Sequence, residues 1–423
     1  MSEKEVNTEV VTEEIELPLL NKTRDPIPAV ITDSVALEAA VAQLSAGDGV
    51  LAIDAERASG FRYSSRAYLI QIRREGAGTF LIDPIEIQNF AQIVSPLNEP
   101  KWILHSATQD LTCLREVGLI PNDLFDTEVA AKLLGKEKVG LAGLIESELG
   151  FRLAKEHSAA DWSTRPLPAE WLNYAALDVE LLIELYEIQF AQLESAGRMD
   201  WAREEFTYLV NWQKPEMRAD PWRKTSGLHQ VREPRSLAIV QALWQARDEI
   251  AQARDKAPGR IFSDALIIDV AKNEVKSARD VFMLPSLRNR AHKAHADLIW
   301  QVRNQALQLP EDSLPGRGPR IQSTPPPKNW PEKYPNAAKR WQVIRPALTE
   351  WAEELHISAE VLISPDPIRQ LCFSPEQALL SDESVSEFLQ KLSVRNWQLN
   401  QCVPVIMKAV SGLSKTELTA TDV

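Results

Sequence analysis

The chain has few cysteines and no long apolar run. Its cysteines are Cys113, Cys372 and Cys402, and no two of them form a CxxC pair. This argues against a disulfide framework and a cysteine zinc site, and it fits a reducing compartment. No apolar stretch approaches the roughly 18 residues of a membrane span, and the acidic start "MSEKEVNTEVVTEEIELPLL" lacks the basic region of a signal peptide. We therefore expect a cytoplasmic protein, with no membrane partner and a disordered acidic tail over residues 1–25.

Positive charge is also scarce, since the net charge is -13. The shortage is uneven: residues 1–226 carry -15, residues 227–330 carry +5 and residues 331–423 carry -3. Local charge rather than the total decides phosphate binding, so the middle of the chain is the part best suited to a nucleic acid.

The first half of the chain alternates short apolar runs with helical patterns. "GVLAIDAE", "AYLIQIRREGAGTFLIDP" and "KWILHSA" predict strands, and Glu75-Gly76-Ala77-Gly78 predicts a turn inside the second run. "QDLTCLREVGL" and "DTEVAAKLLG" predict helices, the latter with Asp126 as its N-cap and Gly135 at its end. This order predicts an α/β domain with a partly antiparallel sheet.

After Phe151 the pattern is helical throughout. "PAEWLNYAALDVELLIELYEIQFAQLESAG" predicts one long amphipathic helix, and proline-rich stretches separate the later helices. The domain boundaries that we predict are a tail over 1–25, an α/β domain over 26–213, a linker over 214–230, a helical domain over 231–310, a proline-rich linker over 311–335, a second helical domain over 336–412 and a tail over 413–423.

Acidic side chains and one phenol recur in this α/β domain. Asp54 and Glu56 project to the same face of a strand, Asp110 follows the strand around Trp102, and Tyr174 and Asp178 share one face of a helix. If these groups converge, the all-oxygen cluster suits Mg²⁺ or Mn²⁺ rather than zinc.

Each part also has a simpler interpretation. A strand-end acid pair is often the start of a solvated loop, Asp110 suits a helix N-terminus, and Tyr174 suits a core aromatic with its hydroxyl at the rim. Asp178 is harder to explain in this way, because the rest of its helical stretch is apolar. The order and spacing of the whole set carry the argument.

"DAE", "HSATQDL" and "YAALD", in that order, resemble the three exonuclease motifs of the DEDD superfamily. Tyr174 stands four residues before Asp178, which is typical of the tyrosine subgroup; the histidine subgroup would have its histidine at Asn173. "LIQIR", "LFDTEVAAKLLG" and "DWSTRPLP" further resemble the ribonuclease D family. The family often has threonine between the first two acids, where this chain has Ala55. The side chain at that position points to the opposite face of the strand from the acids.

The later helices extend this resemblance. "DKAPGRIFSDALIIDVA" and "LPSL" are similar to the helicase and ribonuclease D C-terminal (HRDC) domain, and residues 336–412 resemble a second, diverged copy. The resemblance implies a ribonuclease H-like mixed sheet flanked by helices, an α/β exonuclease domain, followed by two small all-α HRDC-type domains.

The resemblance also implies an activity and roles for residues. The chain would be a 3′–5′ exoribonuclease that hydrolyses RNA, such as tRNA precursor 3′ ends, to 5′-mononucleotides with two Mg²⁺ or Mn²⁺ ions. Asp54 would bridge both ions, Glu56 and Asp178 would hold the ion carrying the nucleophilic water, and Asp110 would serve the other. Tyr174 would orient the water. A monomer is favoured.

Several other residues are weaker candidates. For His105 we favour a structural hydrogen bond, whereas Gln109 either reaches substrate or faces solvent. Lys155, Trp162 and Arg165 either contact nucleic acid or pin their loop to the domain. In the first helical module, phosphate contacts are predicted for Arg260, Lys272, Arg288 and Arg290, against the simpler interpretation of a solvated helical face.

Two other functions stay open at this point. The same motifs serve DNA 3′–5′ exonucleases, and the contact to a ribose 2′-hydroxyl that would decide between them is not visible in a sequence. A non-catalytic RNA-binding adaptor is a third hypothesis, against which the complete set of acids weighs.

Overall fold

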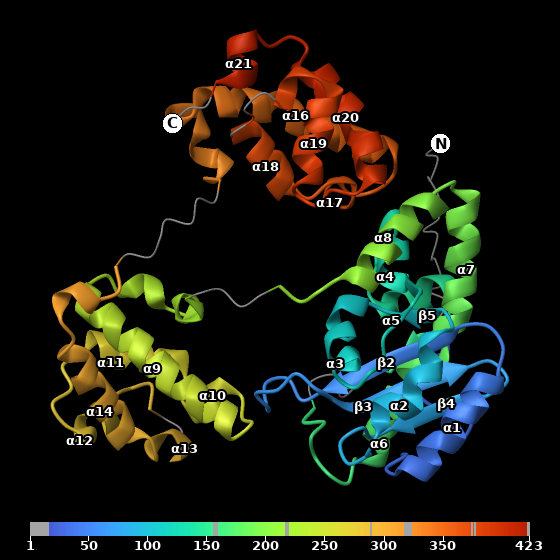
Figure 1. Cartoon of the computed structure of the whole chain (residues 1–423), viewed down its shortest axis with the longest axis horizontal. Coiled ribbons are helices and arrows are strands. Elements are labelled where there is room, and N and C mark those ends of the chain that lie inside the picture. Colours follow the sequence, from blue (N-terminus) through green and yellow to red (C-terminus); the bar gives the residue numbers. More distant parts are fainter. Residues whose placement is uncertain are drawn as a thin grey trace, which may run out of the picture.

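The structure is a computed structural model that describes residues 17–154, 160–215, 220–287, 290–316, 324–373, 375 and 378–420. Figure 1 shows an N-terminal α/β body, coloured blue to green, and two helical bodies, coloured yellow to orange and orange to red. No helix within the described ranges is both long enough and apolar enough to cross a bilayer.

The α/β body is built on a mixed sheet of five strands in the order β4-β3-β2-β5-β6. Strand β2 lies at its centre, antiparallel to β3 and parallel to β5. The strands are β2 (Leu51–Arg57), β3 (Ala67–Arg74), β4 (Gly78–Ile82), β5 (Trp102–Leu104) and β6 (Leu124–Asp126). The predicted strands over "GVLAIDAE", "AYLIQIRREGAGTFLIDP" and "KWILHSA" are thus present.

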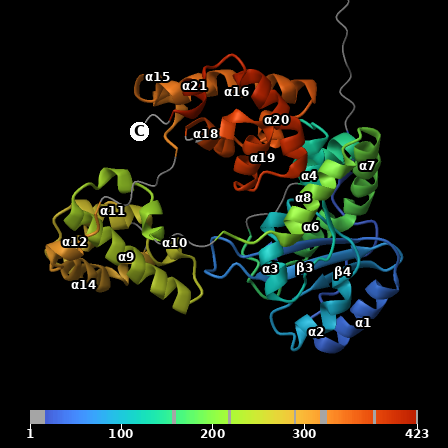
Figure 2. The ribbon, with the colours of Figure 1, turned by 45° about the horizontal axis from the view of Figure 1, so that its top comes forward.

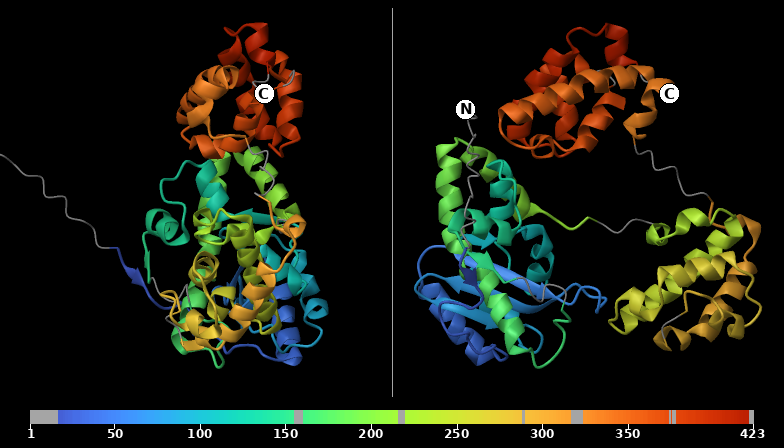
Figure 3. Two further views of the ribbon diagram at one scale, coloured as in Figure 1. Left: turned by 90° about the vertical axis from the view of Figure 1, so that its left-hand side faces the viewer. Right: turned by 180° about the vertical axis from the view of Figure 1, so that it is seen from behind.

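Helices cover both faces of this sheet. Ile53 and Ala55 of β2 are buried in the same hydrophobic cluster as Leu37 and Val41 of α1, while α6 packs against the face that carries Asp54 and Glu56. Seen from behind, α6 crosses that face (Figure 3, right). The helices are α1 (Ser34–Ala46), α2 (Phe90–Val94), α3 (Leu111–Glu116), α4 (Thr127–Leu133), α5 (Leu141–Leu144), α6 (Ala169–Glu180), α7 (Leu182–Ser195) and α8 (Met199–Asn211).

Three sequence-based expectations are wrong in detail. The predicted single helix is broken at Leu181, where φ is -111° and ψ is 6°, because α6 packs on β2, β3 and β4 whereas α7 packs on α4 and β5. The region after Phe151 is not wholly helical, since β7 (Arg152–Leu153) pairs in parallel with β1 (Leu19–Leu20). For the same reason residues 17–25 are not a disordered tail; residues 1–16 lie outside the described part.

The two remaining bodies are helical. The first contains α9 (Pro234–Ala253), α10 (Pro258–Ile261), α11 (Asp264–Lys272), α12 (Ala278–Phe282), α13 (Arg290–Lys293) and α14 (Ala296–Leu307). The second contains α15 (Trp330–Lys333), α16 (Pro335–Glu354), α17 (Ala359–Leu362), α18 (Pro365–Phe373), α19 (Asp382–Gln390), α20 (Asn396–Val410) and α21 (Lys415–Thr419). A mixed sheet flanked by helices followed by a helical C-terminal region confirms the predicted fold class.

Both helical bodies contact the α/β body. The first meets the loop between β2 and β3, where Ala257 N donates to Phe61 O at 3.0 Å and Tyr63 Oη donates to Asp248 at 3.1 Å. The second lies over α4 and α8 (Figure 2), where Trp397 stacks on Trp201 with ring centroids 4.8 Å apart.

Candidate active site

Strand β2 places the first two acids. Asp54 pairs with Gln71 of β3 and Glu56 with Leu69, so both carboxylates project to the face covered by α6. From α6, Asp178 reaches the same point: oxygen atoms of Asp54, Glu56 and Asp178 all lie within 4.8 Å of one another. The structure therefore brings together three of the predicted ligands.

Asp110 joins these acids from the end of β5. It occupies the N-cap position of α3, as the interpretation as a helix-terminal charge requires, but its side chain accepts no capping hydrogen bond. Its Oδ1 atom lies 3.4 Å from Arg57 Nη2, and its carboxyl group is close enough to Asp54 for the charge of Asp54 to act on it. Asp110 is the fourth acid of the cluster, and with 5% of its surface exposed it is buried, whereas Asp54, Glu56 and Asp178 are partly exposed.

Tyr174 stands one helical turn before Asp178 on α6, and its hydroxyl donates a hydrogen bond to the Asp178 carboxylate. The phenol ring packs near the buried Trp162 ring, with centroids 6.4 Å apart. The hydroxyl thus faces the acids while the ring belongs to the surrounding core.

The four acids are poorly compensated. Burial raises the pKa of Asp54, and burial followed by the charge of Asp54 raises the pKa of Asp110 and Asp178 well above their usual range. Burial, then the charges of Asp54, Asp178 and Asp110, raise the pKa of Glu56 to about 10. A cluster of this kind needs either bound protons or a cation at neutral pH.

The donor set fits divalent metal ions. Asp54, Glu56, Asp110 and Asp178 offer only carboxylate oxygens, which hard cations such as Mg²⁺ and Mn²⁺ prefer. Burial and the neighbouring acids also raise the pKa of Tyr174, so its hydroxyl keeps its proton at neutral pH and acts as a hydrogen-bond donor. That is the state needed to orient a water molecule rather than to deprotonate it.

The weaker candidates beside Asp110 have different surroundings. His105 Nδ1 lies 2.9 Å from Thr127 Oγ1, the structural hydrogen bond that the sequence favoured. Gln109 lies in the short turn Ala107–Gln109 before α3 and is exposed to solvent, so substrate contact stays a prediction for it.

Trp162 and Arg165 pin their loop to the domain. Trp162 is fully buried, so the prediction that it stacks on a base is wrong: no face of its ring is open. Arg165 donates to the Tyr68 carbonyl at 2.8 Å and the Trp162 carbonyl at 2.7 Å, and pairs with Asp83. Lys155, from the same prediction, lies outside the described residues.

The predicted basic residues of the first helical body are only partly described. Arg260 Nε donates to Gly60 O at 2.8 Å, and its guanidinium lies 4.0 Å from the centre of the Phe61 ring, so it joins this body to the β2–β3 loop. Lys272 Nζ donates to Gln230 Oε1 at 2.8 Å. Arg288 and the Arg290 side chain lie outside the described part, and nucleic-acid binding stays a prediction for this group.

Two residues near the acids escaped the sequence reasoning. Arg57 directly follows the motif acids, and regular strand alternation would point its side chain to the opposite face of the sheet. The strand register shifts between Glu56 and Arg57, and the Arg57 side chain pairs with Asp110. Gln71 lies opposite Asp54 and is fully buried, yet neither polar atom of its side chain has a hydrogen-bond partner among the described residues. A glutamine in the apolar run "AYLIQIR" was the available signal.

Three parts of the chain match models of known protein families. Residues 28–193 match the family model described as "3'-5' exonuclease", residues 236–302 match the HRDC domain, and residues 323–410 match a model described as "3' to 5' exonuclease C-terminal domain". The chain therefore contains a 3′–5′ exonuclease domain followed by an HRDC domain, and the assignment of residues 336–412 as a second HRDC-like domain stays a prediction.

Similar proteins show which family of 3′–5′ exonucleases the chain belongs to. The chain is 32% identical over 282 residues to ribonuclease D of Shewanella sp. strain ANA-3, covering 65% of this chain and 72% of that protein. It superposes on ribonuclease D of Escherichia coli with a TM-score of 0.65 and 25% identity, covering 92% and 99% of the two chains. It superposes on the crystal structure of a protein from Bifidobacterium adolescentis with a TM-score of 0.85 and 36% identity, covering 94% of this chain and 100% of that one. The chain belongs to the ribonuclease D family and is a 3′–5′ exoribonuclease.

Proposed function

We propose that this protein trims the 3′ ends of structured RNA, such as tRNA precursors, releasing 5′-mononucleotides with two divalent metal ions. The related enzyme from Escherichia coli is described as an exoribonuclease involved in structured RNA processing, which supports this substrate class. The cytoplasmic location and the monomeric state expected from the sequence stay predictions.

The observation that carries the proposal is the convergence of Asp54, Glu56 and Asp178, whose oxygen atoms lie within 4.8 Å of one another. When bound, the two ions supply charge neutralisation for the scissile phosphate and lower the pKa of a water molecule. Asp54 would bridge the ions, Glu56 and Asp178 would hold one, and Asp110 would hold the other. The ion pair with Arg57 orients Asp110, and the central strand β2 positions Asp54, which supports these roles.

Tyr174 orients the attacking water in this proposal. Its protonated hydroxyl, already directed at Asp178, can donate one hydrogen bond to a carboxylate or to a water beside it. Because burial raises rather than lowers its pKa, Tyr174 is unsuited to act as a general base.

A direct assay tests the proposal. The purified chain is incubated with 3′-extended tRNA and with DNA of the same sequence, in the presence of Mg²⁺, Mn²⁺ or EDTA, and the products are separated. We expect release of 5′-mononucleotides from RNA, stopped by EDTA. Degradation of DNA alone would favour a DNA exonuclease, and binding without cleavage would favour the non-catalytic adaptor.

A further inference from the structure

Residues Leu19–Ile27, which we name the N-terminal strap, lie along helix α6. The strap begins at β1, where Arg152 N donates to Pro18 O at 2.9 Å and Ala154 N donates to Leu20 O at 3.3 Å. Asn173 Nδ2 then donates to Asn21 O at 2.8 Å. Since Asn173 immediately precedes Tyr174, this hydrogen bond fixes the strap beside the helix that carries the active-site phenol.

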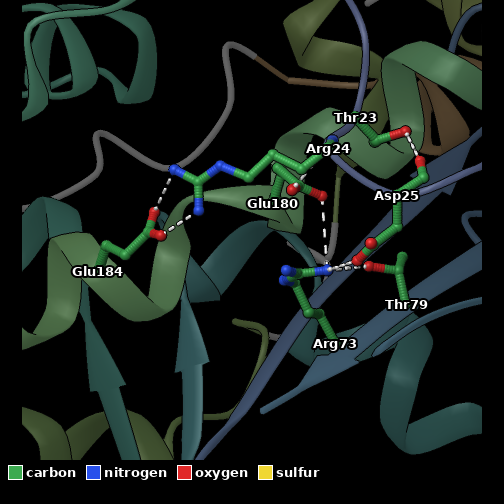
Figure 4. Close-up of polar contacts among 7 residues, drawn as sticks. All are labelled: Thr23, Arg24, Asp25, Arg73, Thr79, Glu180 and Glu184. Atoms are coloured by element: carbon green, nitrogen blue, oxygen red, sulfur yellow. Dashed lines mark hydrogen bonds and ion pairs between the residues drawn. The ribbon is translucent and has the colours of Figure 1, made fainter. Parts of the chain in front are cut away.

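The second half of the strap is anchored by charged groups (Figure 4). Arg24 N donates to Glu180 Oε1 at 3.3 Å, and the Arg24 guanidinium pairs with Glu184. Arg73 of β3 completes the arrangement: its Nη1 atom lies 3.5 Å from Glu180 Oε2 and 3.9 Å from Asp25 Oδ2. The charges of Arg24 and Asp25 are therefore used to hold the strap to the domain.

A cavity of about 800 Å³ lies between the strap and α6. Tyr174 lines this cavity, and the hydroxyl of the same residue is directed at Asp178, so the cavity borders the proposed active site at Tyr174. Its volume falls within the range of about 300–1,000 Å³ that is common for ligand sites. Leu19, Ile27 and Leu177 give the cavity an apolar wall, and Asn21 and Thr23 add polar groups.

Lys22 is the cation in this cavity that the protein leaves available. The side chain is exposed, and no ion pair joins it within the described part of the chain, unlike Arg24 beside it. Glu170, the acid on the opposite wall, lies in the first turn of α6, where the helix dipole stabilises its negative charge. A phosphate entering the cavity would therefore be drawn to the strap side.

We propose that this cavity holds the RNA nucleotide next to the scissile phosphate, and that Lys22 of the strap binds its backbone phosphate. This inference rests on the proposed function, because it takes the acids beside Tyr174 as the place where the RNA phosphate is cleaved. The apolar wall receives the base or ribose face, while the ammonium group of Lys22 meets the negative charge. The strap is then a wall of the substrate site rather than an inert terminal segment.

RNA binding tests the role of Lys22. Full-length chain carrying Asp54→Asn, to prevent cleavage, is titrated against 5′-labelled single-stranded RNA over a series of salt concentrations. Adding Lys22→Ala should raise Kd about fivefold at low salt. It should also make the slope of log K against log salt shallower by about 0.7, the value for one phosphate contact on a single strand.

Lys101 provides the matched control. It precedes β5, its backbone carbonyl accepts from Leu51 N at the start of β2, and it therefore lies at the end of the sheet opposite the acids. Lys101→Ala removes the same charge and should leave the salt slope unchanged. Equal slopes for Lys22→Ala and its parent would overturn the proposal.

Chemical protection gives an independent measure of proximity. The natural thiols Cys113, Cys372 and Cys402 are all buried, so a Lys22→Cys variant presents one accessible thiol. Saturating RNA should slow alkylation of that thiol at least severalfold, and should leave the thiol of a Lys101→Cys variant unaffected. An unchanged alkylation rate at position 22 would overturn the proposal even where binding is weakened.

These readouts separate failure of the strap site from failure of the proposed function. If the wild-type chain releases mononucleotides but Lys22 variants bind RNA normally and are not protected, the strap proposal is wrong and the exoribonuclease assignment stands. If the wild-type chain cleaves no RNA while position 22 is still protected, the proposed function is wrong and the binding site stands.

Discussion

Arg57 Nη2 lies 3.4 Å from Asp110 Oδ1, which pairs the residue after the motif acids of β2 with the buried acid at the start of α3. The positive charge of Arg57 acts on three members of the cluster: it lowers the pKa of Asp54, Glu56 and Asp110 against the larger effect of burial. Arg57 therefore favours the ionised form of these acids, which is the form that accepts a metal ion.

Replacing Arg57 should shift the pH dependence of catalysis. In an Arg57→Gln variant the carboxyl groups lose an opposing charge, so their pKa values rise further and a higher pH is needed to ionise them. We expect the acidic limb of the profile of kcat/KM against pH to move up by about one unit. Arg62→Gln, which removes a bond to Ser163 in the following loop, is the control. An unmoved limb would contradict the role assigned to Arg57.

Asp54→Asn should abolish activity without loss of the fold. Asp54 is the acid whose charge acts on Glu56, Asp110 and Asp178 alike, so its loss should lower kcat by at least about a thousandfold. Removing one buried like charge should leave the Tm in EDTA unchanged or raised, and divalent ions should no longer raise it. Asp48→Asn, at an exposed position before β2, is the control and should retain activity.

Metal binding should release protons. Because the pKa of Glu56 is raised to about 10, the metal-free cluster holds protons at pH 7, and a divalent cation must displace them. Calorimetric titration with Mg²⁺ in two buffers of different ionisation enthalpy should give different apparent enthalpies. Identical enthalpies would show that the acids are already ionised.

The raised pKa of Glu56 should also make the stability of the metal-free protein depend on pH. The folded state binds more protons than the unfolded state between the ordinary pKa of Glu56, 4.5, and its raised value of about 10. The stability of the metal-free protein should therefore fall as pH rises through that window, and added Mg²⁺ should oppose the fall. Urea midpoints measured in EDTA and in Mg²⁺ at several pH values check this.

The sequence predicted the elements that local pattern determines. Alternation placed β2, and the spacing of Tyr174 and Asp178 placed both on one helix face. The sequence did not predict the helix break at Leu181, because helix propensity continues through that residue. It also did not predict the pairing of Leu19–Leu20 with Arg152–Leu153, because a two-residue parallel pair depends on contacts formed elsewhere in the fold. Arg57 and Asn173 were missed for the same reason, since their partners are distant in sequence.

The contact between the α/β body and the last helical body centres on Glu205. Its carboxylate accepts from Arg395 Nη2 at 2.8 Å and from Trp397 Nε1 at 2.8 Å, beside the stacked rings of Trp201 and Trp397. In a Glu205→Ala variant both donors lose this acceptor in a largely buried place, so we expect the free energy of unfolding to fall by about 2 kcal/mol.

Asp200 allows a matched comparison on the same helix. It pairs with Arg203 at 2.9 Å, but its side chain is 88% exposed, so Asp200→Ala should change the free energy of unfolding by less than about 0.5 kcal/mol. Urea unfolding of both variants, together with a double-mutant cycle of Glu205→Ala and Arg395→Ala, measures the coupling across the interface. If the Glu205 variant were as stable as the Asp200 variant, the stability of the protein would not depend on this contact between the two bodies. Both variants should still cleave a short single-stranded RNA.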